Sequence, residues 1–263
     1  MKIISLGSGS KGNCMYVGLD GLNLLFDVGL SMKGINEKLI MSIGIDLEEI
    51  DLILITHQHS DHIKSYGAIG RKYPHITFIL PKEIKEDIFK ITAFIPAKLI
   101  TVEGVRKGRV ANITPFRLNH DVPCYGYVIQ DNITKETYAH IADNGGVVNK
   151  DKVELLTGHT YYGIESNHDK NMQILDETRH EGLKRRVLGY YGHTDNATAM
   201  EFAMRVATPN TKGIMFHHIS EDCNDIELAQ NIHQELIKIW GKVTLFKNIT
   251  IKYATQDDWV ELV

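Results

Sequence analysis

Hydrophobic and polar residues follow two kinds of pattern along this chain, and the changes between them predict its elements. Short alternating or wholly apolar runs predict strands, and longer stretches with apolar residues at helical spacing predict helices. The predicted strands are Lys2–Leu6, Met15–Leu19, Leu22–Asp27, Asp51–Thr56, His75–Leu80, Thr160–Ile164, Gly213–His217 and Val243–Phe246, with a further group of strands within Leu99–Ile141. The predicted helices are Met32–Ile43, Ser60–Arg71, Lys82–Ile91, Val147–Leu156, Leu175–Leu188, Asn196–Ala207 and Asp225–Trp240.

The order of these elements predicts the fold class of the chain. Strand-rich blocks alternate with helices, which is typical of α/β proteins. Asp20-Gly21 joins two apolar runs and is a strong hairpin signal. The four central residues of Asp51–Thr56 are all apolar, as in strands that are buried on both faces. We therefore expect residues 1–263 to form a single α/β domain, in which two sheets carry helices on their outer faces.

The opening segment contains a glycine-rich motif that suggests nucleotide binding. Residues Gly7–Gly12 match the pattern G-x-G-x-x-G, which in dinucleotide-binding folds precedes a helix whose N-terminus holds the pyrophosphate. Here a predicted hairpin follows instead, and Lys11 precedes the last glycine, unlike the lysine of a phosphate-binding P-loop. We therefore expect Gly7–Asn13 to form a turn between strands and to bind no dinucleotide.

Composition narrows the class of protein. Hydrophobic residues make up 43% and charged residues 24% of the 263 residues, which is the balance of a soluble globular protein. No apolar run approaches the roughly 18 residues of a transmembrane helix, and the first residues lack the apolar stretch of a signal peptide. The three cysteines have no metal-finger spacing, so we expect a reducing, cytoplasmic location and no membrane partner. A net charge of −4 argues against a surface coated for nucleic-acid binding but leaves room for a local basic path.

Histidine is the residue type that departs most from ordinary composition, since the chain contains 13. Four side chains able to bind metal follow the apolar strand that ends at Thr56, namely His57, His59, Asp61 and His62. α/β proteins place their sites at such strand ends, and imidazole and carboxylate ligands suit Zn²⁺, Mn²⁺ or iron. In an extended segment His57 and His59 point the same way, while Asp61 and His62 lie beyond the turn. The spacing therefore suits two ions better than one.

Three further candidate ligands follow other predicted strands. His120 follows an alternating segment, Asp143 precedes two glycines that let a backbone come close, and His218 follows the apolar run Gly213–Phe216. His217 lies beside His218, but adjacent strand residues face opposite ways, so only one of the two can be a ligand. Each of these residues alone is as compatible with a structural role as with metal binding. Together with the four-residue cluster, they supply enough ligands for two ions.

The order of these residues resembles that of the metallo-β-lactamase superfamily. The resemblance rests on residues that keep the order of the superfamily's motifs, namely Asp27, His57, His59, Asp61, His62, His120, Asp143 and His218. Further segments are similar to the YycJ/WalJ-type branch, which lies close to nuclease members such as tRNase Z; they are 5–13, 165–169, 183–186, 192–193 and 218–224. The resemblance implies an αββα sandwich, with helices outside two mixed sheets and the metals between the sheets.

The resemblance also implies a set of ligands for two divalent ions, zinc or manganese. It places His57, His59 and His120 on one ion, Asp61, His62 and His218 on the other, and Asp143 between them as a bridge. It selects His218 over His217, which is then expected to pack on the opposite face. Two motifs depart from the branch: Gly-His-Thr-Asp-Asn replaces Gly-His-Leu-Ser-Asn, and Asp143-Asn144-Gly145 replaces Asp-Thr-Gly. These departures keep the ligands and affect the choice of substrate.

His193 is the candidate for a catalytic residue that binds no metal. It precedes a predicted helix for which Thr194 or Asp195 can serve as N-cap, and a helix N-terminus favours anions. The position resembles that of a phosphate-contacting histidine in phosphodiesterases of the superfamily. We expect His193 to bind the phosphate or to protonate the leaving oxygen, and Asp61 to orient the attacking hydroxide. The alternative is a His193 that only hydrogen-bonds the cap.

Several other polar residues are compatible with more than one role. Glu165, Asn167 and His168 form a cluster after an apolar segment, for which a structural network and a functional role are equally supported. Five histidines belong to no cluster and are expected to be ordinary core or surface residues: His75, His140, His159, His180 and His233.

Two basic runs offer a candidate contact with phosphate groups. They lie at Arg106-Lys107-Gly108-Arg109 and at Lys184-Arg185-Arg186. Such runs usually form a solvated face, and the alternative is a path for a phosphate backbone. The second run lies just upstream of His193, which favours that alternative. The candidate substrate-binding residues of this run are Lys184, Arg185 and Arg186.

The candidate site predicts hydrolysis of a phosphodiester. Two close cations clamp a phosphodiester and share a water of lowered pKa. The leading hypothesis is a nuclease acting on DNA ends, with a metal-bridging hydroxide as nucleophile. A cyclic-nucleotide phosphodiesterase, favoured by the acidic net charge, is the second hypothesis, and a thioester or lactam hydrolase is the third. A metal-stabilised binding module is disfavoured, because structural metal sites close their coordination with four ligands. The expected partner is a nucleic acid or nucleotide phosphodiester, and the sequence leaves a homodimer open.

Overall fold

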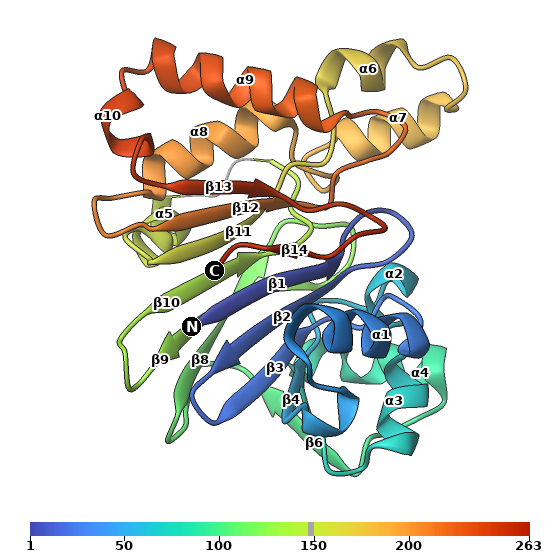
Figure 1. Ribbon diagram of the computed structural model, residues 1–263. Helices are drawn as coiled ribbons and strands as arrows, with labels where there is room; N and C mark the ends of the chain where they lie inside the picture. Colours follow the sequence, from blue (N-terminus) through green and yellow to red (C-terminus); the bar gives the residue numbers. More distant parts are fainter. Residues whose placement is uncertain (147–149) are drawn as a thin grey trace.

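The computed structural model describes residues 1–146 and 150–263, which form two mixed seven-stranded sheets (Figure 1). The strands of the first sheet are β1 (Lys2–Gly7), β2 (Cys14–Leu19), β3 (Leu22–Phe26), β4 (Leu52–Leu54), β5 (Thr77–Pro81), β6 (Lys98–Val102) and β14 (Val260–Glu261), in the spatial order β14-β1-β2-β3-β4-β5-β6. The strands of the second sheet are β7 (Arg106–Lys107), β8 (Ala111–Leu118), β9 (Cys124–Asp131), β10 (Thr137–Ile141), β11 (Tyr161–Glu165), β12 (Gly213–His217) and β13 (Thr250–Tyr253), in the order β13-β12-β11-β10-β9-β8-β7.

Helices cover the outer faces of the two sheets (Figure 1). The helices beside the first sheet are α1 (Met32–Ile43), α2 (Ser60–Ile63), α3 (Tyr66–Lys72) and α4 (Lys85–Thr92). The helices beside the second sheet are α5 (Lys150–Leu156), α8 (Asn196–Val206), α9 (Ile226–Ile239) and α10 (Val243–Phe246). Two short helices, α6 (Lys170–Leu175) and α7 (Glu181–Leu188), extend this layer at one end. The predicted αββα fold class is confirmed.

Buried apolar side chains form three layers that hold this sandwich together. Between the sheets, Met15 and Phe26 of the first sheet belong to one cluster with Ile129 and Tyr138 of the second. A second cluster lies under α1 and α3, and a third lies under α8 and α9. Because side chains alternate between the two faces of a strand, each sheet contributes to the central layer and to one outer layer.

The direction of the strands brings the loops of the candidate site to one edge of the sandwich. Strands β3 to β6 run parallel, and so do β10 to β13. The carboxyl ends of parallel strands lie at the same edge of a sheet. The residues that directly follow or end these strands include Asp27 after β3, Glu165 at the end of β11 and His218 after β12.

One predicted element is wrong in type, and two predicted helices are not continuous. Val243–Phe246 forms the helical turn α10 and not a strand, because periodicity does not separate a strand from a helix in so short a run. Leu175–Leu188 continues as a helix only from Glu181, where α7 begins, and α6, which ends at Leu175, lies before the predicted helix and was not predicted. Between them, the Asp176 carboxylate accepts bonds from the backbone N–H and hydroxyl of Thr178 at 2.6 and 2.7 Å, which stabilises a turn.

Further predictions differ from the structure in continuity or in their bounds. Ser60–Arg71 is divided into α2 and α3, since the Ser65 N–H donates to the Val28 carbonyl (2.9 Å) between them. The group of strands within Leu99–Ile141 spans both sheets, because β6 pairs with β5 of the first sheet. The first residues of the predicted helix Val147–Leu156 lie outside the described residues, and α5 covers the rest. Strands β13 and β14 have no counterpart in the sequence prediction.

Candidate metal centre and catalytic site

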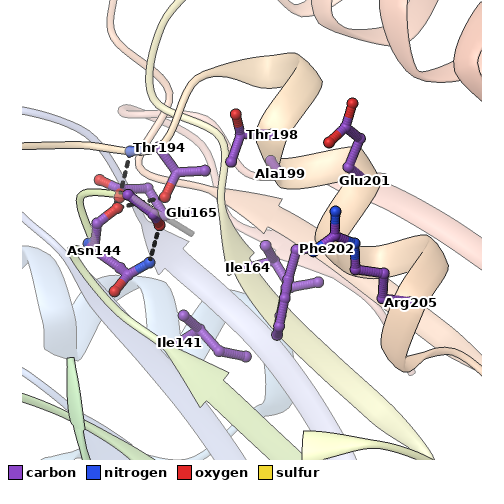
Figure 2. A pocket seen from close by; sticks show the side chains of 11 residues that line it. Ile141, Asn144, Ile164, Glu165, Thr194, Thr198, Ala199, Glu201, Phe202 and Arg205 are labelled. Atoms are coloured by element: carbon purple, nitrogen blue, oxygen red, sulfur yellow. Dashed lines mark hydrogen bonds between the residues drawn. The ribbon is translucent and has the colours of Figure 1, made fainter. Parts of the chain in front are cut away.

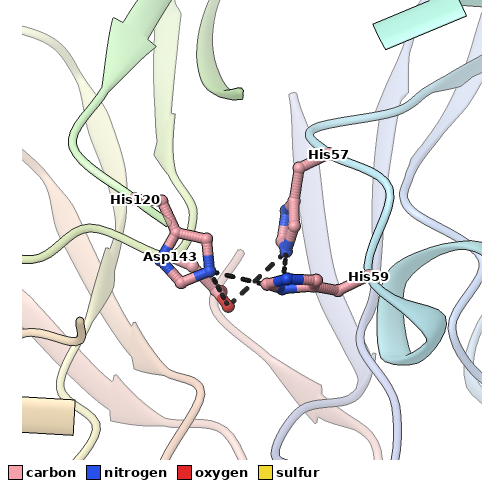
Figure 3. A group of neighbouring side chains, drawn as sticks. All are labelled: His57, His59, His120 and Asp143. Carbon is pink, nitrogen blue, oxygen red and sulfur yellow. Dashed lines mark hydrogen bonds and ion pairs between the residues drawn. The ribbon is translucent and has the colours of Figure 1, made fainter. Parts of the chain in front are cut away.

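Three histidines and one aspartate meet where the edges of the two sheets face each other (Figure 3). His57 and His59 follow β4 of the first sheet, whereas His120 follows β8 and Asp143 follows β10 of the second. The His59 Nδ1 lies 3.1 Å from His57 Nε2 and 3.3 Å from His120 Nε2. The Asp143 Oδ2 lies 3.7 Å from His57 Nε2 and 3.8 Å from His120 Nε2. The first predicted set of ligands is therefore brought together in space.

A second group lies on the other side of Asp143. The Asp61 Oδ2 lies 3.5 Å from His62 Nε2 and 3.8 Å from His218 Nε2. The Asp143 Oδ1 lies 3.5 Å from His62 Nε2 and 3.0 Å from His218 Nδ1. The Oδ2 of Asp143 thus faces the first group and its Oδ1 faces the second, which is the arrangement expected of a bridging carboxylate. The structure places His218, and not His217, in this group.

Hydrogen bonds to the outer ring nitrogens fix the orientation of several candidate ligands. The His62 Nδ1 donates to Asp27 Oδ2 at 2.7 Å, and Asp27 also accepts bonds from the Thr56 hydroxyl and backbone N–H, each at 2.8 Å. The His120 Nδ1 donates to the Gly192 carbonyl at 3.1 Å. Partners of this kind leave the opposite nitrogen of the ring free to bind a metal.

The donor atoms of the two groups fit divalent cations. Within the part of the chain that the structure describes, the buried Asp143 Oδ1 makes no regular hydrogen bond, although buried carboxylate oxygens are normally paired, and its contact with His218 Nδ1 at 3.0 Å is an ion pair. Burial lowers the pKa of His57, so this imidazole is neutral, as a ligand must be. Burial alone would also lower the pKa of His218, but the carboxylates of Asp143 and Glu165 raise it to about 10. The negative charge at this point attracts a cation, and imidazole with carboxylate suits Zn²⁺ or Mn²⁺.

Glu165 is the centre of a buried network beside Asp143. Its Oε2 accepts the backbone N–H groups of Asn144 and Thr194 at 2.9 and 3.0 Å (Figure 2). Its Oε1 lies 2.7 Å from His193 Nδ1 and 2.9 Å from His218 Nδ1. Burial would raise the pKa of Glu165, but the two histidines lower it to about 2. Because Glu165 is ionised, the Nδ1 of His193 donates to it, and the Nε2 is left for other partners.

The two motifs that depart from the branch pattern lie together beside His193. The Thr194 hydroxyl donates to the Asn144 carbonyl, so the two departing motifs contact each other. Asp195 is the N-cap of α8, because its side chain accepts the Thr198 N–H at 3.1 Å. His193 therefore does not cap the helix and instead contacts Glu165.

A cleft with a volume of about 430 Å³ opens over both groups. Its walls include Asp61, His193 and Asn167, together with Arg186 from α7. The Asn167 Nδ2 donates to the His218 carbonyl at 2.8 Å, so this side chain supports the loop of a candidate ligand. The cleft is thus bounded by candidate metal ligands, the Glu165-bound histidine and a guanidinium.

The three predicted basic residues of α7 have different surroundings. Arg186 lines the cleft, and its Nε and Nη2 both lie 2.7 Å from the Asp121 Oδ2. The Lys184 Nζ donates to the Ile174 carbonyl at 3.0 Å, and the Arg185 Nε donates to the Glu181 carbonyl at 3.3 Å. Of the predicted run Lys184-Arg185-Arg186, only Arg186 belongs to the described residues that line the cleft.

Other sequence predictions are placed outside the two groups. His217 is buried and stacks on His140, with ring centroids 5.0 Å apart and planes at 10°. His168 is buried and lies beside Asp195 in an isolated bridge. Sequence reasoning missed the role of Glu165, although its position at the end of an apolar strand is the signal that identified His57. It also missed Asp121, for which the sequence holds no comparable signal.

The glycine-rich opening forms the turn between β1 and β2, as predicted, and packs against the site. The Ser8 hydroxyl accepts the His218 N–H at 2.8 Å, and the Asn13 Nδ2 lies 3.2 Å from His62 Nε2. A Cβ atom on Gly12 would lie 2.4 Å from the Gly29 carbonyl oxygen, so only glycine fits there. Close packing around the site therefore accounts for this motif.

Comparison with known proteins identifies the family. The sequence profile of the metallo-beta-lactamase superfamily matches residues 7–195. The chain belongs to the metallo-β-lactamase superfamily. It is 34% identical over 235 residues to a Bacillus anthracis protein named exodeoxyribonuclease YycJ, covering 86% of this chain and 84% of that protein. It is 31% identical over 264 residues to exodeoxyribonuclease WalJ of Streptococcus pneumoniae, covering 96% of this chain and 93% of that protein. The predicted superfamily and YycJ/WalJ-type branch are confirmed.

Solved structures show the same fold at lower sequence identity. The metallo-β-lactamase-fold protein YhfI from Bacillus subtilis superposes with a TM-score of 0.71 at 16% identity and covers 98% of each chain. The short form of human tRNase Z superposes with a TM-score of 0.66 at 14% identity and covers 100% of each chain. Within residues 1–146 and 150–263, none of the helices has the length and apolar character needed to cross a membrane.

Proposed function

We propose that this chain is a metal-dependent phosphodiesterase that acts as a nuclease on DNA ends. Its relatives at 34% and 31% identity are named exodeoxyribonucleases. The observation that carries the proposal is the contact of 2.7 Å between His193 and Glu165, beside Asp143 and at the wall of the cleft. The deoxyribose oxygen that leaves when DNA is cleaved is a poor leaving group and needs a proton, and a histidine held by a carboxylate can supply one.

The proposed cofactors are two divalent ions, zinc or manganese. The residues that would hold them are His57, His59 and His120 for one ion, Asp61, His62 and His218 for the other, and Asp143 for both. When bound, such ions offset the charge on the phosphate oxygens and lower the pKa of a water molecule.

The side chains of this protein supply the proton transfers. His193 donates a proton from Nε2 to the leaving oxygen, while Glu165 holds its Nδ1 and stabilises the charged imidazolium form. Asp61 lines the cleft and accepts a hydrogen bond from the attacking water, which orients its lone pair toward phosphorus. Arg186 lies in the same wall and interacts with the non-bridging phosphate oxygens.

The three cysteines support the proposed cellular location. Cys14, Cys124 and Cys223 are buried and free, which supports a location in the reducing cytoplasm. Light scattering on the purified protein decides between a monomer and the homodimer that the sequence leaves open.

The proposal is tested with a series of phosphodiesters in the presence of Mn²⁺ or Zn²⁺. We expect cleavage of bis-p-nitrophenyl phosphate and of labelled DNA. His193→Ala should keep the metal content of the wild type and lower DNA cleavage by roughly 10²–10⁴-fold, the range for loss of a general acid. The loss should be smaller with bis-p-nitrophenyl phosphate, because p-nitrophenolate leaves without a proton. His75→Ala, a change of an exposed histidine, is the control.

Three outcomes would contradict the proposal, two of them for His193 and one for the substrate. Metal loss in His193→Ala, or unchanged activity on every phosphodiester, would show that His193 has a structural role. Cleavage of cyclic nucleotides or RNA without cleavage of DNA would remove DNA as the substrate while leaving a phosphodiesterase.

Glu165→Gln provides a second prediction for the same pair. The amide keeps the size of the side chain but removes the charge that holds the His193 ring, so DNA cleavage should fall by roughly 10²–10⁴-fold. When two residues act as a unit, the effects of replacing them on kcat/KM are not additive. The double variant with His193→Ala should therefore be little worse than the more damaging single change, as measured by kcat/KM at full metal occupancy. Losses that multiply would mean that the two residues act separately.

A further inference from the structure

Two tyrosines at the edge of the candidate site have exposed rings. Tyr190 and Tyr191 are 57% and 60% exposed and lie between α7 and α8, in the segment that leads to His193. Their ring centroids are 5.1 Å apart, with the planes at 86°. Rings with this exposure contribute little to the core, so packing of the described residues does not account for an aromatic pair at this place.

The Tyr190 side chain is fixed to the loops that carry two candidate ligands. Its hydroxyl accepts a bond from the Asn119 Nδ2 at 3.0 Å, and Asn119 directly precedes His120. Its ring lies on the turn after Asp143, because a Cβ atom on Gly146 would lie 2.7 Å from the Tyr190 Cδ2. The ring therefore has a defined position relative to the metal centre although more than half of it is exposed.

The backbone on the other side of the pair is fixed as well. The His193 N–H donates to the Val187 carbonyl at 3.0 Å, and the Gly192 carbonyl accepts the bond from His120 Nδ1 at 3.1 Å. The segment is thus held at both the candidate acid and a candidate ligand. An aromatic surface that is already ordered loses little conformational entropy when a ligand binds it.

The chemistry of the site selects the ligand of these rings. Both tyrosines lie outside the set of described residues that line the cleft, so a small substrate held within the cleft does not reach them. A polymer strand that continues from the cleft passes over its edge, where exposed Arg185 and Arg186 of α7 precede the pair. Aromatic rings beside cations are the usual binding surface for unpaired nucleobases.

We propose that Tyr190 and Tyr191 form a stacking platform for unpaired bases of a single-stranded end whose scissile phosphate lies in the cleft. The proposal rests on the proposed nuclease function and specifies its substrate as a strand with unpaired bases next to the site. Paired bases are stacked on their neighbours and do not present a free face to the platform.

Steady-state kinetics with Mn²⁺ test this platform. For a single-stranded DNA oligonucleotide, Tyr191→Ala should raise KM by about 5- to 150-fold, the range for loss of one stacked base, with kcat nearly unchanged. The kcat/KM for bis-p-nitrophenyl phosphate, which has no bases, should match that of the wild type. Tyr191→Phe should keep the wild-type KM, since it retains the ring. Trp240→Ala, which removes an exposed aromatic side chain at the α10 end of α9, is the matched control (Figure 1).

Fluorescence of 2-aminopurine in the oligonucleotide measures stacking without turnover. In a His193→Ala background, binding should quench a 2-aminopurine near the cleaved end, and adding Tyr190→Ala and Tyr191→Ala should abolish the quenching. Wild-type KM in Tyr191→Ala, an equal loss on both substrates, or the same effect from Trp240→Ala would overturn the platform. If the wild type cleaves bis-p-nitrophenyl phosphate but neither binds nor cleaves single-stranded DNA, the platform is wrong while phosphodiesterase activity stands. If it cleaves no phosphodiester, the proposed function fails, and the quenching alone decides whether the rings stack on bases.

Discussion

Asp121 connects a wall of the cleft with two candidate metal ligands. Its Oδ2 lies 2.7 Å from the Arg186 guanidinium, and its Oδ1 lies 3.4 Å from His59 Nε2 and 3.3 Å from His120 Nε2. The opposite ring nitrogen of His59 faces His57 in the first group of candidate ligands. A carboxylate beside the outer nitrogen of a ligand histidine favours the tautomer that binds metal. We infer that Asp121 positions His59 and that Arg186 positions Asp121.

Replacement of this carboxylate should weaken metal binding without removing a ligand. Asp121→Asn should lower the affinity for Zn²⁺ by about 10- to 100-fold, the usual effect of losing such a partner, as measured by competition with a chromogenic chelator. Asp222→Asn is the matched control, because Asp222 lines the same cleft and pairs with Arg179 at 2.9 Å. Wild-type affinity in Asp121→Asn, or an equal loss in the control, would leave Asp121 with no role in positioning.

Four of the candidate ligands could be predicted because their signal is local, whereas Asp121 could not. His57 to His62 stand together after an apolar strand, so spacing alone marks them. The role of Asp121 depends on Arg186, which lies 65 positions away in the chain. Only the fold brings these two side chains together.

At the scale of elements, regular periodicity was a better guide than short apolar runs. In α9 the buried residues Ala229, His233 and Ile237 recur every fourth position, which predicts a helix on the surface of a sheet. In α10 the run is too short to show a period, and in the turn between α6 and α7 the decisive interactions come from the side chain of Asp176. In these two segments the local structure is therefore determined by contacts that the hydrophobic pattern does not contain.

His233 of α9 occupies a core position and should make stability depend on pH. The Tyr253 hydroxyl donates to its Nδ1 at 2.9 Å, and its Nε2 donates to the Asn196 carbonyl at 3.0 Å. Burial lowers the pKa of His233 to about 4, below its ordinary value of 6.5. The unfolded chain therefore takes up a proton before the folded one, so the contribution to stability is complete above pH 6.5 and is lost as the pH falls toward 4.

Urea unfolding at several pH values checks this expectation. Between pH 6.5 and 4, His233 alone should contribute up to about 1.4 kcal/mol of lost unfolding free energy per pH unit. His233→Gln keeps a donor and an acceptor but does not titrate, so its stability should fall less steeply with decreasing pH. His75→Gln, at an exposed position, should show the slope of the wild type. Equal slopes in all three proteins would mean that His233 takes up a proton at the same pH in the folded protein as in the unfolded chain.

At the scale of the whole molecule, the candidate metal centre joins the two sheets. The cluster that begins at His57 follows a strand of the first sheet, while His120, Asp143 and His218 follow strands of the second. Asp143 approaches donors from both groups, and among the described residues its Oδ1 makes ion-pair contacts but no regular hydrogen bond. We infer that bound cations stabilise the packing of one sheet against the other, and that residues 1–263 unfold as one unit.

Removal of the metal should therefore lower the unfolding temperature of the whole protein. A ligand at 100 times its Kd stabilises the folded state by about 2.7 kcal/mol, which corresponds to a rise in Tm of about 5–11 °C for a chain of this size. Calorimetry of chelator-treated protein, with and without Mn²⁺ or Zn²⁺, measures the shift. Asp143→Ala should lose more of it than His59→Ala, because Asp143 faces both groups and His59 only one.

The number of unfolding transitions distinguishes cations that join the two sheets from cations that bind to one sheet only. If the cations join both sheets, a single transition should move as a whole when metal is added. Two transitions, of which only one responds to the metal, would mean that the sheets unfold separately and that the centre stabilises only one of them. An equal shift in Asp143→Ala and the wild type would exclude the bridging position for this carboxylate, because a ligand shared by both ions cannot be removed without weakening the binding of each.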